Sequence, residues 1–335
     1  MALLQIDGLS VRPPAGAARP LVDGVSLSVG DGEVVGLVGE SGSGKSVTAR
    51  AVIGLRPGGA LVEGRIRVGD VDVLDASAEQ LRALRTGEVS MIFQDPRAGI
   101  NPMRRIGDFM TESLRRNEGW DTDRAMARAE ELLTAVAMPD PRRHLRQHPH
   151  ELSGGMLQRV MIAAALATDP RLLLCDEPTT ALDVTTQAEI LSILSGLQAD
   201  RGLGVLFITH DLDLAAAICD RVYVMYAGRI VESAAADALF AEPRHPYTSG
   251  LLTSTPDLDG AHERLLPIPG QSLSLLESPA GCSFAPRCAY AEPGRCDAAA
   301  PELTAIGGGR EVACVRAVEV ASLLPGRRAE AGGTG

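Results

Sequence analysis

The sequence predicts an α/β protein organised around a parallel sheet, and three observations lead to that prediction. Two continuous apolar segments, residues 172–175 and 205–208, flank a segment of helical periodicity, and strands that alternate with helices indicate parallel pairing. A third apolar strand, residues 34–38, ends in a glycine-rich turn that precedes a helical stretch from Val47. Between these parts, the strand signals disappear over residues 95–150, which indicates a helical insertion.

The N-terminal part reads as short strands separated by glycine turns. Residues 65–68 and 71–73 flank a Gly-Asp turn, which is typical of an antiparallel hairpin. Together with residues 3–11 and 25–29, they predict an N-terminal antiparallel β subdomain.

One helix of the insertion is placed by its capping and breaking residues. Thr122 or Asp123 is suited to cap its start, and Pro139 and Pro141 end it. The apolar positions between them recur at helical spacing, and they are Ala125, Ala129, Leu132, Leu133 and Val136.

The C-terminal part begins with a predicted hairpin and then becomes irregular. Residues 222–226 and 229–232 flank an Ala-Gly turn. After Pro243, prolines and cysteines become frequent, which predicts a small cysteine-containing module. The end of the chain after Leu324 is rich in Gly, Arg and Ala, and we expect a disordered tail there.

Composition and charge exclude several classes of protein. The chain has 335 residues, of which 45% are hydrophobic and 22% charged, and this is typical of a folded globular protein. Its net charge of −11 argues against nucleic acid as a partner. The longest apolar run, residues 160–167, is too short to cross a membrane, and the N-terminus lacks the features of a secretion signal. We therefore expect a cytoplasmic protein whose cysteines are reduced or metal-bound.

A phosphate-binding loop is the first motif with a chemical role. Residues 39–46 fit the pattern G-x-x-x-x-G-K-[ST] between a strand and a helix, where loop amides and a helix N-terminus bind phosphates. A chance glycine-rich turn is the alternative interpretation. Of the 32 basic residues, 31 are arginine, and the only lysine occupies the position where the motif needs a compact ammonium that arginine cannot replace. A chance turn does not explain this placement. The candidate nucleotide ligands are Gly39, Glu40, Ser41, Gly42, Ser43, Gly44, Lys45 for the β and γ phosphates, and Ser46 for Mg²⁺.

An acidic pair follows the strand at residues 172–175. Asp176 is placed to bind Mg²⁺ through water, and Glu177 to polarise the water that attacks the phosphate. An acidic pair at a strand end is common in proteins, but its combination with a phosphate loop favours the catalytic interpretation.

A third motif, residues 152–159, reads Leu-Ser-Gly-Gly-Met-Leu-Gln-Arg. Alone, it would be an ordinary N-cap for a helix predicted over residues 156–168, although an exposed helix start is also an anion site. In its order after Gln94 and before the acidic pair, it resembles the signature motif of ABC ATPases. The residues of this second anion site are Ser153, Gly154 and Gly155.

The resemblance to ABC ATPases implies roles for further residues. Gln94 corresponds to the glutamine that contacts the metal and relays motion toward a permease. Asp183, in Ala-Leu-Asp, corresponds to the D-loop that crosses the dimer interface, and His210 to the switch histidine that contacts the γ-phosphate. The aromatic residue that stacks on adenine in this family is absent from residues 11–22.

Motifs in the last third of the chain narrow the family. Residues 245–248, 267–270 and 281–288, with Cys296 and Cys314, look like the C-terminal extension of ATP-binding subunits of bacterial oligopeptide and dipeptide importers. The implied fold is a RecA-like P-loop core with the N-terminal β subdomain, the helical insertion and the cysteine-containing module. The expected boundaries are 1–94 and 151–240 for the ABC ATPase core, 95–150 for the helical subdomain, 241–320 for the extension and 321–335 for the tail.

The same resemblance implies an ATP hydrolase that powers peptide import from the cytoplasmic face of the membrane. Two such subunits sandwich ATP head to tail, so a second ATPase subunit, identical or homologous, is required. Two permease subunits and, indirectly, an extracytoplasmic peptide-binding protein complete the transporter. Other cargo such as nickel chelates, a soluble ABC ATPase of translation or repair, and a small-molecule kinase are the alternatives.

Four cysteines of the C-terminal module form a candidate metal site. A module rich in proline and glycine needs a source of stability besides burial, and disulfides are disfavoured in the cytoplasm. The spacing matches neither the close pairs of zinc sites nor common ferredoxin patterns, so the residues leave a [4Fe-4S] cluster and Zn²⁺ open. The resemblance favours a structural [4Fe-4S] cluster. Its ligands would be Cys282, Cys288, Cys296 and Cys314, while Cys175 and Cys219 are expected in the core.

Overall fold

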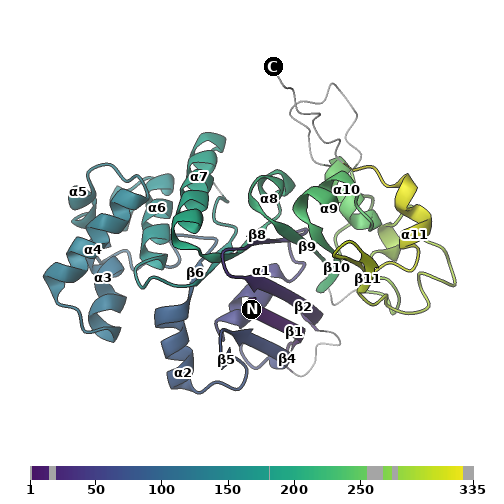
Figure 1. Ribbon diagram of the computed structural model, residues 1–335, viewed down its shortest axis with the longest axis horizontal. Helices are drawn as coiled ribbons and strands as arrows, with labels where there is room; N and C mark the ends of the chain where they lie inside the picture. The colour runs from purple at the N-terminus through teal and green to yellow at the C-terminus, as the bar shows by residue number, and fades with distance from the viewer. Residues whose placement is uncertain (1, 15–19, 181, 255–266, 274–277, 327–335) are drawn as a thin grey trace.

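The computed structural model describes residues 2–14, 20–180, 182–254, 267–273 and 278–326. Figure 1 shows a central sheet, a small sheet near the N-terminus, a group of helices at one end of the molecule and the C-terminal module at the other. The helical group is inserted between two segments of the central sheet. The predicted α/β fold class is therefore confirmed.

The small sheet is the predicted antiparallel subdomain. Its strand order is β2-β1-β4-β5, and Leu4 and Ile6 of β1 are fully buried in the core between the two sheets. Ser77 caps a helix that the sequence analysis did not predict. The elements are β1 (Ala2–Arg12), β2 (Val22–Gly30), β4 (Leu61–Val68), β5 (Val71–Asp72), α2 (Ala78–Ala83) and the π-helical turn η1 (Leu84–Glu88).

The central sheet brings the ends of parallel strands to one edge. Strands β6, β7, β8, β3 and β9 are hydrogen-bonded in that order and run parallel. Because Gln94, the acidic pair, His210 and the phosphate loop each follow one of these strands, they meet at the carboxyl-end edge of the sheet. The elements are β3 (Val34–Val38), α1 (Lys45–Val52), β6 (Val89–Ile92), β7 (Leu172–Asp176), α7 (Val184–Arg201), β8 (Gly204–Thr209), α8 (Leu212–Ile218) and β9 (Arg221–Tyr226).

The insertion folds as helices, but its predicted cap is wrong. The Asp121 carboxylate accepts a hydrogen bond from the Arg124 amide, so Asp121 is the N-cap and Thr122 is already helical. Helix α4 ends before the prolines, and Pro141 starts the next helix. The helices are α3 (Ile106–Asn117), α4 (Thr122–Ala135), α5 (Pro141–Leu145), η2 (Pro149–Glu151) and α6 (Gly154–Ala165). Across the residues that the structure describes, no helix has both the length and the apolar character needed to cross a bilayer.

The C-terminal module continues the central sheet. Strand β12 pairs antiparallel with β10, which pairs with β9, so the module is less irregular than predicted. The turn η5 lies inside the segment predicted as a tail, whereas residues 327–335 lie outside the described residues. The elements are β10 (Arg229–Ala235), α9 (Ala236–Ala241), α10 (Pro246–Ser254), η4 (Ala285–Arg287), β11 (Thr304–Gly307), β12 (Arg310–Val312), α11 (Ala317–Val320) and η5 (Ala321–Leu323).

Candidate functional site

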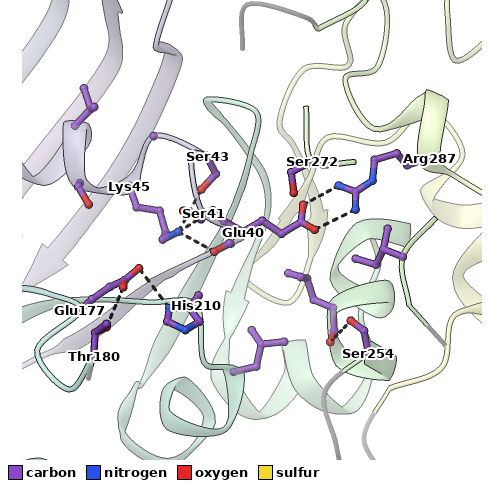
Figure 2. Close-up of a pocket in the computed structure, with 18 of the residues that line it drawn as sticks. Glu40, Ser41, Ser43, Lys45, Glu177, Thr180, His210, Ser254, Ser272 and Arg287 are labelled. Carbon is purple, nitrogen blue, oxygen red and sulfur yellow. Dashed lines mark hydrogen bonds and ion pairs between the residues drawn. The ribbon is translucent and has the colours of Figure 1, made fainter. Parts of the chain in front are cut away.

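A cleft of about 950 Å³ opens where the parallel strands end. The phosphate loop lines it together with Gln94, Glu177 and His210, so the structure brings these predicted residues to one place. Figure 2 shows Lys45 of the loop near Glu177 and His210. The C-terminal part of the chain lines the same cleft, through Leu251, Ser254, Pro267, Ile268, Gly270, Ser272 and Arg287.

The phosphate loop is shaped by a glycine and by its lysine. Gly39 has a φ of 152°, and a Cβ atom there would lie 2.1 Å from the carbonyl oxygen of Met225, so a larger residue does not fit. The Nζ atom of Lys45 donates to the carbonyl oxygens of Gly39, at 2.7 Å, and Glu40, at 2.9 Å, and only 4% of Lys45 is exposed. Burial lowers the pKa of Lys45, and nearby carboxylates oppose that shift.

The first turn of α1 is suited to an anion. The helix begins at Lys45, two residues earlier than predicted, and its N-cap Gly44 has no side chain that could accept hydrogen bonds from the first amides. Amides at a helix start have no acceptor within the helix, and the helix dipole favours negative charge there. With the Lys45 ammonium beside it, this turn can bind phosphate groups.

Ser46 and Asp176 supply oxygen atoms next to the loop. The Ser46 hydroxyl donates to Oδ1 of Asp176 at 2.6 Å. Oδ2 of Asp176 is buried and has no hydrogen-bond partner among the described residues, and its nearest cation is Arg50 at 3.7 Å. Burial raises the pKa of Asp176, while Ser46 and Arg50 oppose that shift. A hydroxyl beside a buried carboxylate oxygen of this kind fits Mg²⁺, which prefers oxygen ligands.

Glu177 is held in the cleft by three polar side chains. Nε2 of Gln94 donates to its Oε2 at 2.8 Å. Oγ1 of Thr180 donates to the same oxygen at 2.9 Å, and Nδ1 of His210 lies 3.4 Å from its Oε1 (Figure 2). Its backbone has a φ of 49°, which residues other than glycine rarely adopt, and its amide donates to Ile208. Such strain is frequent at functional sites.

The second predicted anion site lies elsewhere on this chain. Ser153 caps α6 by accepting a hydrogen bond from the Met156 amide at 3.3 Å, and the helix begins at Gly154 rather than at residue 156. None of Ser153, Gly154 and Gly155 lines the cleft that the described residues form.

Asp183 caps the neighbouring helix α7. Its carboxylate accepts hydrogen bonds from the amide of Thr186, at 3.0 Å, and from its hydroxyl, at 2.7 Å, and these bonds lower the pKa of Asp183. A Cβ atom on Gly155 would lie 2.6 Å from Cγ2 of Thr186, so the starts of α6 and α7 pack against each other. Ala181, the first residue of the predicted D-loop, lies outside the described residues.

Among the cleft residues that were not predicted, two contact a predicted residue through their side chains. Thr180 donates a hydrogen bond to Glu177 and stands three residues after it in the sequence. A hydroxyl residue so close to the acidic pair could have been predicted to contact Glu177. Arg287 forms an ion pair with Glu40, which lies 247 residues earlier in the chain. No local sequence pattern marks a contact between residues so far apart.

The four cysteines of the C-terminal module line one small cavity as free thiols. Burial raises the pKa of Cys314 to about 11 and also raises those of Cys282 and Cys288, so these thiols are protonated at neutral pH. In the described part of the chain, no group of three or more His, Cys, Asp or Glu side chains is arranged to hold a metal ion. Among the described residues the geometry therefore supports neither the expected [4Fe-4S] cluster nor the Zn²⁺ alternative at these cysteines. Cys175 and Cys219 are buried in the core, as expected.

Comparison with known proteins relates both parts of the chain to one kind of protein. Residues 22–180 match the ABC transporter family, and residues 231–296 match the oligopeptide/dipeptide transporter, C-terminal region. The chain is 43% identical over 310 residues to the oligopeptide transport ATP-binding protein OppD of Haemophilus influenzae, with 92% of this chain and 95% of that protein covered. It is 45% identical over 317 residues to the dipeptide transport ATP-binding protein DppD of Escherichia coli K12, with 94% and 96% covered.

Solved structures show the same fold. A dimeric ATP-binding cassette, MJ0796, in a post-hydrolysis state with bound ADP and Pi, superposes with a TM-score of 0.62. Its sequence is 25% identical, and the match covers 70% of this chain and 98% of that one.

Proposed function

The chain belongs to the family of ABC transporter ATP-binding proteins, and from this premise we propose that it hydrolyses ATP to power the import of peptides. The observation that carries the proposal is the cleft in which the phosphate loop meets Gln94, Glu177 and His210. The similarity of residues 231–296 to the oligopeptide/dipeptide transporter region supports peptides as the cargo.

Different residues of the cleft bind the phosphates and activate the attacking water. Lys45 and the first amides of α1 bind the β- and γ-phosphates. Glu177 accepts a hydrogen bond from the attacking water, which makes that water a better nucleophile toward the γ-phosphorus as the bond to ADP breaks. Gln94 and Thr180 orient the Glu177 carboxylate through their hydrogen bonds to Oε2, and His210 binds the γ-phosphate.

Ser46 and Asp176, with Gln94, would hold the Mg²⁺ that accompanies ATP. The buried Oδ2 of Asp176, without a hydrogen-bond partner among the described residues, supports this assignment. When bound there, the ion neutralises charge on the phosphates.

A second ATPase subunit, identical or homologous, completes the site. Ser153, Gly154 and Gly155 do not line the cleft of their own chain, so they are available to the nucleotide of a partner. The related cassette MJ0796 is described as dimeric, which supports the proposal. Asp183 lies at the start of α7 next to Val184, which is 83% exposed, and a partner subunit would cover this surface.

The pair of ATPase subunits acts on other subunits of the transporter, which are separate chains. We assign to the transporter two permease subunits in the membrane and, indirectly, an extracytoplasmic peptide-binding protein. This subunit then works at the cytoplasmic face of the membrane, bound to the permeases. The similarity to OppD and DppD supports these partners.

The cysteine cavity is the proposed site of a structural [4Fe-4S] cluster. Four thiols surround one space, and four thiolates are the ligand set of such a cluster. Binding would release the protons that the buried thiols hold.

Anaerobic purification is expected to yield a brown protein with a broad absorbance near about 400 nm and about four iron and four sulfide ions per chain. Cys288→Ser should lose most of the iron, because it removes one of the four ligands. Cys219→Ala, which changes a core cysteine away from the cavity, should retain it. Iron and sulfide are measured by colorimetric assay of the purified chain. One equivalent of zinc without sulfide would exclude the cluster.

Peptide uptake tests the proposed function directly. A strain that lacks this gene is expected to stop taking up labelled dipeptides or oligopeptides, because the pair of ATPase subunits that drives the permeases cannot form without this chain. The wild-type gene should restore uptake, and Glu177→Gln should not. Undiminished peptide uptake together with a loss of nickel uptake would identify a different cargo for the same ATPase.

A further inference from the structure

The phosphate loop carries its own carboxylate, Glu40, which faces the C-terminal module. Arg287 of that module forms two parallel ion-pair contacts with it, Nη1 to Oε2 at 2.7 Å and Nη2 to Oε1 at 3.0 Å (Figure 2). Only 7% of Arg287 is exposed, whereas 23% of the Glu40 side chain is exposed, so a buried arginine pairs with a partly exposed carboxylate far away in the chain. Paired contacts of this geometry are among the strongest that arginine makes.

Both partners of the pair are held from several sides. The Nε atom of Arg287 donates to the carbonyl oxygen of Pro269 at 2.9 Å, and Nη1 lies 3.4 Å from the hydroxyl of Tyr226. The backbone amide of Glu40 donates to the hydroxyl of Tyr247 at 2.9 Å. The C-terminal part of the chain therefore binds both the side chain and the main chain of one residue in the phosphate loop.

The charge of Glu40 explains what this pair does. A carboxylate in a loop that binds phosphates repels them, and the repulsion is strong where the surroundings exclude water. Resting on the proposed function, we propose that Arg287 is a positioning residue that neutralises Glu40 and thereby sets the affinity of the phosphate loop for ATP. The cysteine-containing module, in which Arg287 directly precedes Cys288, is then part of the nucleotide site.

The inference is tested by measuring the MgATP affinity of full-length variants in which the charge of Arg287, or of both Arg287 and Glu40, is removed. We expect Arg287→Gln to weaken MgATP binding by about tenfold or more, equivalent to about 1.4 kcal/mol of binding free energy, because Glu40 is left unpaired. The loss should be larger for ATP than for ADP, since repulsion grows with phosphate charge. The double variant Glu40→Gln/Arg287→Gln should recover most of the MgATP affinity that Arg287→Gln loses, because the unpaired Glu40 charge is gone. Arg287→Lys, which keeps the positive charge, should lose less than Arg287→Gln.

The matched control is Arg295→Gln. Arg295 also precedes a cysteine of the module and pairs with a carboxylate, Glu319, but it does not line the cleft. Its replacement should leave the Kd for MgATP within about twofold of the wild type. Affinities are measured with fluorescent ATP and ADP analogues, and melting curves verify that each variant is folded.

The outcomes of these measurements distinguish a failure of the inference from a failure of the proposed function. A wild-type chain that does not bind MgATP would refute the proposed function. If the wild type binds and Arg287→Gln binds equally well, the inference is wrong and the proposed function stands. A folded double variant that binds weakly would also refute the inference, because removal of the Glu40 charge then has no effect and Arg287 acts on the phosphates or the fold. The binding result for the double variant remains informative even if Arg287→Gln alone does not fold.

Discussion

Replacing Glu177 by glutamine is expected to reduce ATP hydrolysis by about 10²–10⁴-fold, the usual effect of losing a positioned acid or base. Glutamine keeps the size of the side chain and a carbonyl oxygen that can still accept from Gln94 and Thr180. It cannot take part in proton transfer from the attacking water. Because Lys45 and the first turn of α1 are unchanged, MgATP binding should be retained, and the closed dimer should accumulate.

The measurement is phosphate release by the assembled transporter, together with the Kd of the isolated chain for MgATP. Glu79→Gln is the matched control, since Glu79 is an exposed glutamate in the first turn of α2 and does not line the cleft. Its ATPase rate should equal that of the wild type. An undiminished rate in Glu177→Gln would mean that another residue polarises the water.

Lys45→Arg is expected to reduce ATP hydrolysis by at least about 10²-fold, the effect of losing an electrostatic contact at the reacting group. The ammonium is enclosed by the carbonyl oxygens of Gly39 and Glu40 and is almost fully buried. A planar guanidinium is larger and cannot make the same compact contacts. We therefore expect weaker MgATP binding as well as slower hydrolysis.

Chemical labelling gives an independent measurement at the same residue. Lys45 is the only lysine, so an amine-selective reagent modifies only its side chain and the α-amino group, which serves as the internal reference. Saturating MgATP should slow the labelling of Lys45 but not that of the α-amino group, as measured by mass spectrometry. Equal labelling of Lys45 with and without nucleotide would contradict its placement at the phosphates.

Local sequence was sufficient to predict most of the elements near the cleft. Continuous apolar runs predicted β3, β7 and β8, because strands buried on both faces need apolar residues along their whole length. The residues that follow these strands then had to meet, since parallel strands place their carboxyl ends at one edge. Strand β6, only four residues long, and the short helix α2 were not predicted, because segments of that length have little periodicity.

Element boundaries depended on contacts that the sequence did not specify. Asp121, Thr122 and Asp123 are all good N-cap residues, and the structure selects Asp121 through its hydrogen bond to the Arg124 amide. Likewise, α6 begins at Gly154 and not at residue 156, because Ser153 is its cap.

By itself, the sequence determined the fold class, the order of the subdomains and the phosphate-loop and acidic motifs, because each depends on the spacing of residues within one element or turn. Only the tertiary structure decided that Arg287 reaches Glu40 and that the C-terminal module shares the cleft with the phosphate loop. These features join segments far apart in the chain. Their pairing depends on how the sheet and its attached module pack, and no local pattern of residue types specifies that packing.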